Sequence, residues 1–335
     1  MKLRFIVCAC VLSGAGSVYA ENSVSIVGNY YKERSTRVVS PEVTIKKELP
    51  FDGQVEATYL VDQITSASGA FTPEADVAFQ EYRNEIRFGL SKRFGDLTPR
   101  VRFRYSTESD YTSWGLSAEV AAEFFDKNTR LVGQFTYQQD DVEARGQGNF
   151  QDELTTTLVG LRLVQVVLPE LLINLCAETQ ILSGYTENAY RVEMHPRDRN
   201  RYALGGGAAY RILSTQTTIR ADYRFYTDSW KLRAHSIGLQ FDQQVLPSLA
   251  IVPKVRYHGQ NGVYFTDLVD GFRTTDPKLF PFSSGFLGVD LLWRLWFFDG
   301  SFLDGATIKP SYAVYFSGTR YGTAHIAQLG GYWPF

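Results

Sequence analysis

The sequence predicts an all-β protein, a transmembrane antiparallel up-and-down β-barrel of about 16 strands, with about 14 to 18 as the range. Aromatic residues make up 14% of the 335 residues and Gly is frequent, whereas Met and Cys are rare, and this balance favours twisted β-structure. Apolar and polar residues alternate with a period of two along most of the chain, as in strands with two different faces. The breaks between these segments alternate between short and long, which suits a barrel with tight turns at one rim and loops at the other.

The first 20 residues have the composition of a cleaved export signal. Lys2 and Arg4 precede an apolar run at 5–12, and small residues then lead to the sequence Val18-Tyr19-Ala20. This order of features is typical of a signal peptide. An N-terminal membrane anchor is the alternative, but the apolar run is short and no internal stretch reaches the roughly 18 apolar residues of a membrane helix. We predict cleavage after Ala20 and a single barrel domain over residues 21–335.

The period-two segments give the strands in chain order. In segment 217–228, TTIRADYRFYTD, apolar residues alternate with charged ones, which predicts a strand with one apolar and one charged face. The predicted strands are 23–33, 36–48, 54–64, 81–93, 99–108, 112–125, 129–139, 153–167, 171–183, 201–213, 216–228, 231–245, 249–260, 284–297, 304–317 and 322–335. The number of these strands is even, as a closed bacterial barrel requires.

The connections between strands fall into two classes. Short ones, with the composition of tight turns, lie at 50–53, 95–97, 126–128, 168–170, 213–215, 246–248 and 299–301. Longer and more polar ones lie at 64–80, 139–152, 184–200 and 260–282. A soluble sandwich or propeller is the alternative for such strands, but a propeller would repeat motifs at a fixed period and no such repeat is visible.

Aromatic residues stand where the predicted strands approach their ends. At the short-turn rim they are Phe94, Phe125, Phe297 and Phe298, and toward the long-loop rim they are Tyr105, Tyr111, Trp114, Tyr137, Tyr202, Tyr226, Trp230 and Tyr257. Two such belts predict the two aromatic girdles of a membrane-spanning barrel.

The charged face of the predicted strands carries the functional expectation. An Arg or Lys facing lipid at the bilayer midplane costs about 2 to 4 kcal/mol, so these residues should face the interior. The predicted pore-lining residues are Arg83, Glu85, Arg87, Arg100, Arg102, Arg104, Arg220, Asp222, Arg224, Lys254, Arg256, Asp290 and Arg294. Basic residues dominate this set, although the whole chain has 34 Lys and Arg against 36 Asp and Glu.

A wide barrel with a basic interior favours a passive porin-like channel for small polar or anionic solutes. Two alternatives stay open. The inner Arg and Asp residues could form a network that only stiffens the wall. The barrel could also be closed and display its long loops for adhesion or complex assembly, with residues 260–282 as the candidate plug.

An outer-membrane enzyme is the less favoured class. A nucleophilic Ser needs an adjacent base, and none of the four His residues begins a His-x-Ser pair, while Asp140-Asp141 has no evident His partner. Asp267, Asp270 and Asp276 match the spacing of no calcium loop. We therefore expect no catalytic residue, no metal and no cofactor, and the acidic overall charge gives no reason to expect a nucleic-acid partner.

The end of the chain resembles the C-terminal assembly signal of outer-membrane barrels. Gln328 and Gly330 match the polar and glycine positions of that signal, and Trp333 and Phe335 match its aromatic positions. The resemblance implies a place in the cell outer membrane of a Gram-negative bacterium. It implies two partners, the outer-membrane lipid and the barrel-assembly machinery, and the analogy with porins allows a homo-oligomer.

Most of the mature chain also resembles an uncharacterised family of bacterial outer-membrane barrel proteins, which is known mainly as a domain of unknown function. The matching segments are 30–33 (YYKE), 62–68 (DQITSAS) and 223–230 (YRFYTDSW). The family implies a porin-like architecture and assigns no activity.

Overall fold

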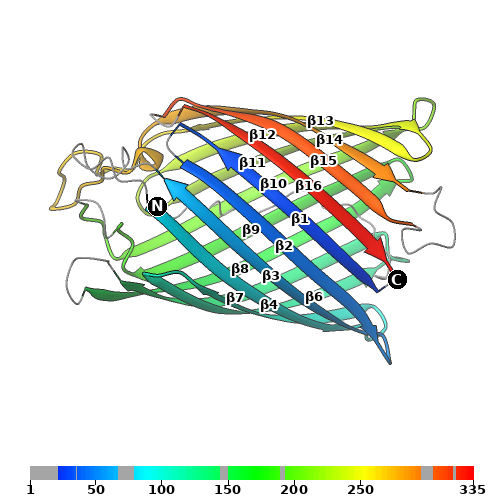
Figure 1. Ribbon diagram of the computed structural model, residues 1–335, viewed down its shortest axis with the longest axis horizontal. Helices are drawn as coiled ribbons and strands as arrows, with labels where there is room; N and C mark the ends of the chain where they lie inside the picture. Colours follow the sequence, from blue (N-terminus) through cyan, green and yellow to red (C-terminus); the bar gives the residue numbers. More distant parts are fainter. Residues whose placement is uncertain are drawn as a thin grey trace.

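The computed structural model describes residues 22–34, 36–66, 79–143, 150–188, 193–295, 305–319 and 322–335. These residues form one closed barrel in which every strand pairs with its chain neighbours and β1 closes the ring against β16 (Figure 1). All of the pairings are antiparallel, so the predicted up-and-down barrel of about 16 strands is confirmed. The predicted signal peptide, residues 1–20, with its cleavage site at Ala20, lies outside the described residues.

The elements follow the chain in order. They are β1 (Ser23–Lys32), β2 (Thr36–Leu49), β3 (Gly53–Ser66), β4 (Phe79–Lys92), β5 (Leu97–Thr107), β6 (Tyr111–Phe124), β7 (Thr129–Glu143), β8 (Gln151–Leu168), β9 (Leu171–Gly184), β10 (Asp198–Ile212), β11 (Thr217–Asp228), β12 (Arg233–Leu246), β13 (Leu249–Gln260), the 3-10 helix η2 (Pro277–Leu279), β14 (Phe282–Arg294), β15 (Thr307–Ser317) and β16 (Thr323–Pro334). Within the described ranges, no helix is long and apolar enough to cross a membrane.

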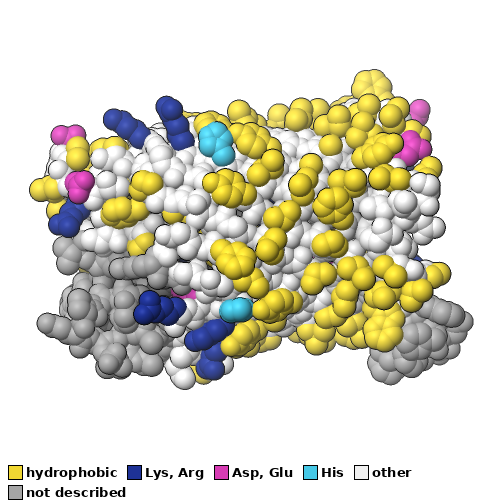
Figure 2. Space-filling view, turned by 90° about the horizontal axis from the view of Figure 1, so that it is seen from above, with side chains coloured by type: hydrophobic (Ala, Val, Ile, Leu, Met, Phe, Trp, Pro, Cys, Tyr) yellow, Lys and Arg dark blue, Asp and Glu magenta, His cyan; other side chains and the backbone are white. Residues whose placement is uncertain are grey.

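The period-two pattern separates an outer face from a lumen face. Successive side chains of a strand point to opposite sides of the sheet, and in a closed barrel these sides are the exterior and the lumen. In β4, Ile86, Phe88 and Leu90 are exposed on the outside, whereas Glu85 and Arg87, which have the opposite parity, form an ion pair inside. Figure 2 shows the result, a broad band of hydrophobic side chains with charged ones concentrated toward its ends.

The two rims differ as the sequence predicts. Long connections lie at the left end of the barrel in Figure 1, and most of the short turns and the C-terminus lie at the right end. The predicted loop 139–152 is too long, because β7 continues to Glu143 and β8 begins at Gln151. Beyond the hydrocarbon layer of the membrane, two strands can stay paired by backbone hydrogen bonds without an apolar face. A segment that is polar on both faces can therefore still continue a strand. The predicted turn 299–301 lies outside the described residues.

Three aromatic residues are not part of the predicted outer girdle. Tyr111 and Trp230 are buried, with 7% and 2% of their surface exposed, and Tyr226 stands on the lumen face of β11, where its hydroxyl bonds Asp228. Tyr202 and Tyr257 do face outward. Closeness to a rim therefore does not place an aromatic residue in the girdle, because its parity along the strand decides which face it takes. The predicted Phe297 and Phe298 lie outside the described residues.

Candidate functional site

The lumen wall is the first candidate site, and strand parity places the predicted pore-lining residues on it. Glu85 lies at the centre of a network of hydrogen bonds and ion pairs on this wall. Its carboxylate accepts from Nε of Arg87 at 2.6 Å and from Nη2 of Arg104 at 2.6 Å. Arg87 also reaches Glu42 of β2 at 3.1 Å, and Arg104 donates to Ser113 of β6 at 3.0 Å. A chain of charge-assisted hydrogen bonds thus crosses the strands from β2 to β6.

On the opposite wall, acids again neutralise the predicted cations. Asp290 accepts from Lys254 at 2.6 Å and also pairs with Lys309 of β15 at 3.1 Å. Arg220 pairs with Asp242 of β12 at 2.7 Å. Three further pairs complete the set, namely Arg83 with Asp62, and, at 3.9 Å each, Arg100 with Glu119 and Arg256 with Asp222.

These pairs change the predicted charge of the lumen. The sequence-based set omitted Glu42, Asp62, Glu119, Asp242 and Lys309. Each of them stands on a strand whose alternation is broken by Ser, Thr or Gly, so its lumen parity was harder to recognise. Odd and even positions counted along the whole strand assign these five residues to the lumen face, even where apolar and charged residues do not alternate. The wall is therefore mixed in charge and largely self-neutralised.

Three predicted cations form no ion pair within the described part of the chain: Arg102, Arg224 and Arg294. Arg294 ends β14 at the short-turn rim and is exposed. Arg102 and Arg224 lie deeper, and the Nε atom of each is buried without a hydrogen-bond partner. Arg224 also lines a small cavity of about 80 Å³ with Glu178, Gln180, Arg201 and Tyr226. Within the described part of the chain, these two arginines are thus the deeper cations of the predicted set that form no ion pair.

The loop between β13 and β14 folds over one side of the mouth. Its Val263, Phe265 and Leu279 pack with Trp230, Leu232 and Ala234 in a buried apolar group, here called the mouth cluster. Phe265 has no exposed surface. Gln260 is the last residue of β13, and its side chain has the parity of the lumen face. It donates to the carbonyl oxygens of Lys278 and Phe280 at 2.8 and 3.0 Å. The returning half of the loop therefore lies against the inner wall.

A buried ion pair anchors the mouth cluster. Arg199 donates to Oδ2 of Asp228 through Nε at 2.9 Å and through Nη2 at 2.5 Å. The guanidinium carbon of Arg199 also lies 4.0 Å from the ring centroid of Trp230. Asp228 accepts from the backbone N–H groups of Trp230 and Leu232, both at 3.0 Å. One carboxylate thus fixes the β11–β12 turn on which the β13–β14 loop rests.

The neighbouring loop residues support the same arrangement. His195 contacts the rings of Trp230 and Phe265, and the backbone of Met194 bridges to Arg273. Burial, together with the negative charge of Asp270, holds the pKa of Tyr264 above its ordinary value. Tyr264 therefore stays neutral at physiological pH and adds no charge to the loop.

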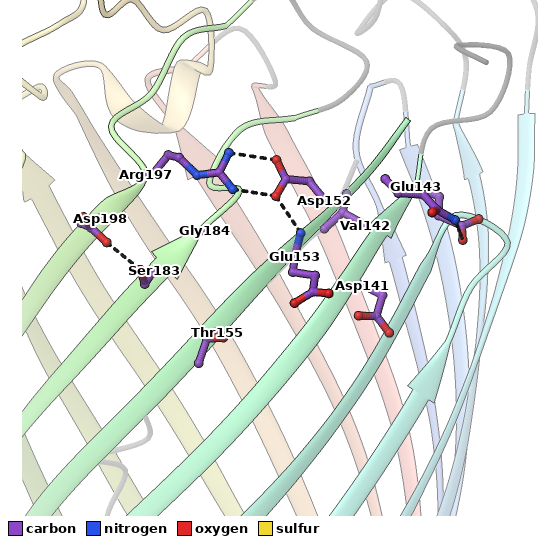
Figure 3. Close-up of a pocket in the computed structure, with 11 residues that line it drawn as sticks. Asp141, Val142, Glu143, Asp152, Glu153, Thr155, Ser183, Gly184, Arg197 and Asp198 are labelled. Carbon is purple, nitrogen blue, oxygen red and sulfur yellow. Dashed lines mark hydrogen bonds and ion pairs between the residues drawn. The ribbon is translucent and has the colours of Figure 1, made fainter. Parts of the chain in front are cut away.

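A second hollow of about 900 Å³ lies at the loop end of β7 to β10 (Figure 3). Five of its eleven lining residues are acids and Arg197 is its basic residue. The guanidinium of Arg197 binds both carboxylate oxygens of Asp152 at 2.9 and 2.6 Å. Burial and the nearby acids raise the pKa of Tyr185, beside this hollow, to about 12. By strand parity, Asp141, Glu153 and Asp198 face outward, so this arc of the outer rim is negative.

No group of His, Cys, Asp and Glu among the described residues is arranged to hold a metal ion. Of the three acids weighed for calcium, Asp276 caps η2 by accepting from the backbone N–H of Lys278 at 3.0 Å. Asp270 lies in a turn at positive φ. The hydrogen bond of Asp276 and the backbone conformation of Asp270 are thus part of the fold of the loop.

The residues that resemble an assembly signal form the seam of the barrel, where β16 pairs with β1. Gln328 faces the lumen and donates to Asn29 at 2.7 Å, and Gly330 lies on the same face. Trp333 and Phe335 take the outer face, and Trp333 lies over Gly331. The polar and aromatic positions of the motif thus occupy opposite faces of the closing strand.

A closed barrel with an apolar outer band and a charged interior defines the class of outer-membrane β-barrels. Residues 70–269 match the family described as protein of unknown function (DUF3570), and the chain belongs to this family. The predicted resemblance to an uncharacterised, porin-like barrel family is thereby confirmed. No curated protein is similar enough in sequence to count as a relative.

Solved structures share the fold. CdiB from Acinetobacter baumannii is 8% identical with a TM-score of 0.58, and the match covers 93% of this chain and 60% of that one. A bacterial polysaccharide outer membrane secretin is 7% identical with a TM-score of 0.58, over 95% and 99% of the two chains. OccD3 (OpdP) of Pseudomonas aeruginosa is 8% identical with a TM-score of 0.52, over 94% and 91%. At such identities the likeness shows the fold alone.

Proposed function

We propose that the protein is a passive channel of the outer membrane that admits small polar solutes and favours anions. The observation that carries this proposal is the charge of the lumen wall, where acids neutralise most cations but leave Arg102 and Arg224 without an ion pair among the described residues. A barrel of this strand number is wide enough for an aqueous path. Uncompensated charges on a low-dielectric wall attract counter-ions into such a path. The likeness to OccD3 supports the barrel fold on which such a path depends.

Conductance in planar lipid bilayers tests the proposal. The refolded full-length protein is expected to give current steps, with a reversal potential in a salt gradient that indicates anion preference. Absence of steps in folded, heat-modifiable protein would refute the channel. Steps with cation preference would refute only the role of the two arginines.

The double substitution Arg102→Gln and Arg224→Gln is expected to lower the anion-to-cation permeability ratio. A unit charge about 6 Å from an ion in water changes its energy by about 0.7 kcal/mol, with opposite signs for an anion and a cation, so each arginine changes the ratio by about tenfold. Arg294→Gln is the matched control, because it removes the same charge from the exposed rim. An equal loss of selectivity in the control would mean that overall charge, not the inner arginines, sets the preference.

Asp290→Asn should shift selectivity in the opposite direction. Asp290 is the shared partner of Lys254 and Lys309, so its neutralisation leaves two ammonium groups on the wall. The anion-to-cation permeability ratio should rise by about tenfold by the same Coulomb estimate. The reversal potential measures this change, and an unaltered value would place both lysines outside the ion path.

The mouth cluster favours a second candidate function, a barrel that does not conduct and presents its loops. The β13–β14 loop, predicted as the candidate plug, lies against the inner wall at the mouth. Conductance separates the two functions, since a presenting barrel would remain silent in the bilayer until this loop is shortened.

A further inference from the structure

Three basic side chains stand side by side on the outer face at the loop end of the barrel. Lys32 of β1 is in register with Arg37 of β2 on one side and with His325 of β16 on the other. All three are exposed. Because directly opposed residues share a face, the three point outward together. They are called the basic rim patch below.

Among the residues that the structure describes, the strands around this patch place no acid on the outer face. Directly opposed like charges such as Lys32 and Arg37 destabilise a sheet unless an anion lies between them. Strands β1, β15 and β16 contain no Asp or Glu, and the acids of β2 and β3 face the lumen, where Glu42 and Asp62 are paired. The nearby Glu33 is buried and accepts from Tyr31 at 2.7 Å.

The surface immediately below the patch is apolar. Toward the barrel centre, Tyr30 follows Lys32 and Val39 follows Arg37 on the outer face, exposed by 41% and 36%. The hydroxyl of Tyr312 lies 2.7 Å from Nδ1 of His325, which places a tyrosine at the boundary between the two zones, as expected for a membrane interface. In Figure 2, basic side chains and histidines lie where the hydrophobic band ends.

The outer rim is not basic all round. On the β7–β10 arc the outward-facing residues include Asp141, Glu153 and Asp198. A general attraction of the barrel to anions therefore does not explain the patch. Its chemistry, cations above an exposed apolar wall, suits a molecule with an anionic head and acyl chains.

We propose that the basic rim patch binds the phosphorylated headgroup of a lipid in the surrounding outer leaflet. The phosphate accepts from Lys32 and Arg37 and relieves their repulsion, while the acyl chains lie along Tyr30 and Val39. In outer-membrane barrels the long-loop rim faces the cell exterior, so the lipid is one of the outer leaflet. This binding does not depend on whether the lumen conducts.

Native mass spectrometry of the full-length protein in detergent tests the proposal. The probe is a diphosphorylated glycolipid of the lipid A type, compared with the same lipid without phosphates and with inorganic phosphate. Wild type should retain the phosphorylated lipid, and the variant Lys32→Gln with Arg37→Gln should bind it about 30-fold more weakly, since each cation near an anionic membrane contributes about fivefold. The control, Lys47→Gln with Lys92→Gln, removes two outer-face cations from the opposite rim.

Three outcomes would overturn the proposal. They are equal retention by wild type and the Lys32/Arg37 variant, equal retention of the phosphate-free lipid, and an equal loss in the control. If the protein bound inorganic phosphate but did not retain the lipid, the ligand of the patch would be a free anion and not a lipid. Heat-modifiability on a gel verifies that the variant is folded, and removal of a like-charge pair is not expected to impair folding.

Discussion

Replacing Asp228 with Ala is expected to release the mouth cluster from the barrel wall. Asp228 accepts hydrogen bonds from Arg199, from the hydroxyl of Tyr226 and from the backbone of Trp230 and Leu232. The side chains of Arg199 and Asp228 are 8% and 0% exposed. Removing one partner of such a buried pair costs about 3 to 5 kcal/mol, because the other charge stays buried without compensation.

The loss should be local. The strand ladder of the barrel does not depend on Asp228, whereas the β11–β12 turn does. We expect amide protons of residues 261–281 to exchange faster by about a hundredfold or more, following from that free energy, while amides in β1 to β9 keep their protection. Hydrogen exchange read by mass spectrometry measures both, and trypsin cleavage within the loop gives a second measure.

Asp242→Ala is the matched control for this experiment. Asp242 also pairs with an arginine, Arg220, but about a quarter of each side chain is exposed to the lumen, so water compensates for the loss. Exchange in the loop should then stay near the wild-type rate. If Asp228→Ala left the loop protected, the apolar contacts of Phe265 and Trp230 would suffice to hold it and the ion pair would not be its anchor.

The fold could be predicted because period two and turn composition are local properties. The strand 217–228 was predicted at 216–228, and β13 at its observed bounds, since each carries both an alternating face and a turn at its end. The mouth cluster could not be predicted. Trp230 and Phe265 lie 35 positions apart and meet because the β11–β12 turn and the β13–β14 loop share one side of the mouth, a relation that only the closed ring defines.

The sequence predicts which residues stand on the charged face of each strand, but it did not predict the net charge of the lumen wall. Arg83 and Arg87 were expected on the charged face of their strand, but their partners Asp62 and Glu42 lie on other strands, whose acids the prediction did not include. Pairing between strands fixes which acid meets which base, and a single strand carries no information about its neighbour's register. The sequence of a barrel therefore predicts which residues face the lumen better than it predicts the electrostatic potential of the lumen.

Enlarging Gly331 is expected to impair assembly of the barrel as strongly as removing Trp333. The ring of Trp333 lies over Gly331 on the outer face of β16, so a side chain at residue 331 would run into ring atoms. The ring must then turn away from the strand. If the assembly machinery recognises aromatic residues at the end of the chain, Gly331→Val should lower the folded protein in the outer membrane several-fold, as should Trp333→Ala and deletion of Phe335, with export across the inner membrane unchanged.

Gly330→Ala is the control on the same strand, because a Cβ there meets Lys309 at an ordinary contact distance of 3.7 Å. It should assemble like wild type. The measurement is the heat-modifiable, folded fraction in isolated outer membranes, together with the tryptophan emission of the purified protein. If Gly331→Val assembled normally and Trp333→Ala did not, assembly would require the indole of Trp333 but not its position over Gly331. Normal assembly of the chain without Phe335 would contradict the assignment of this strand as the assembly signal.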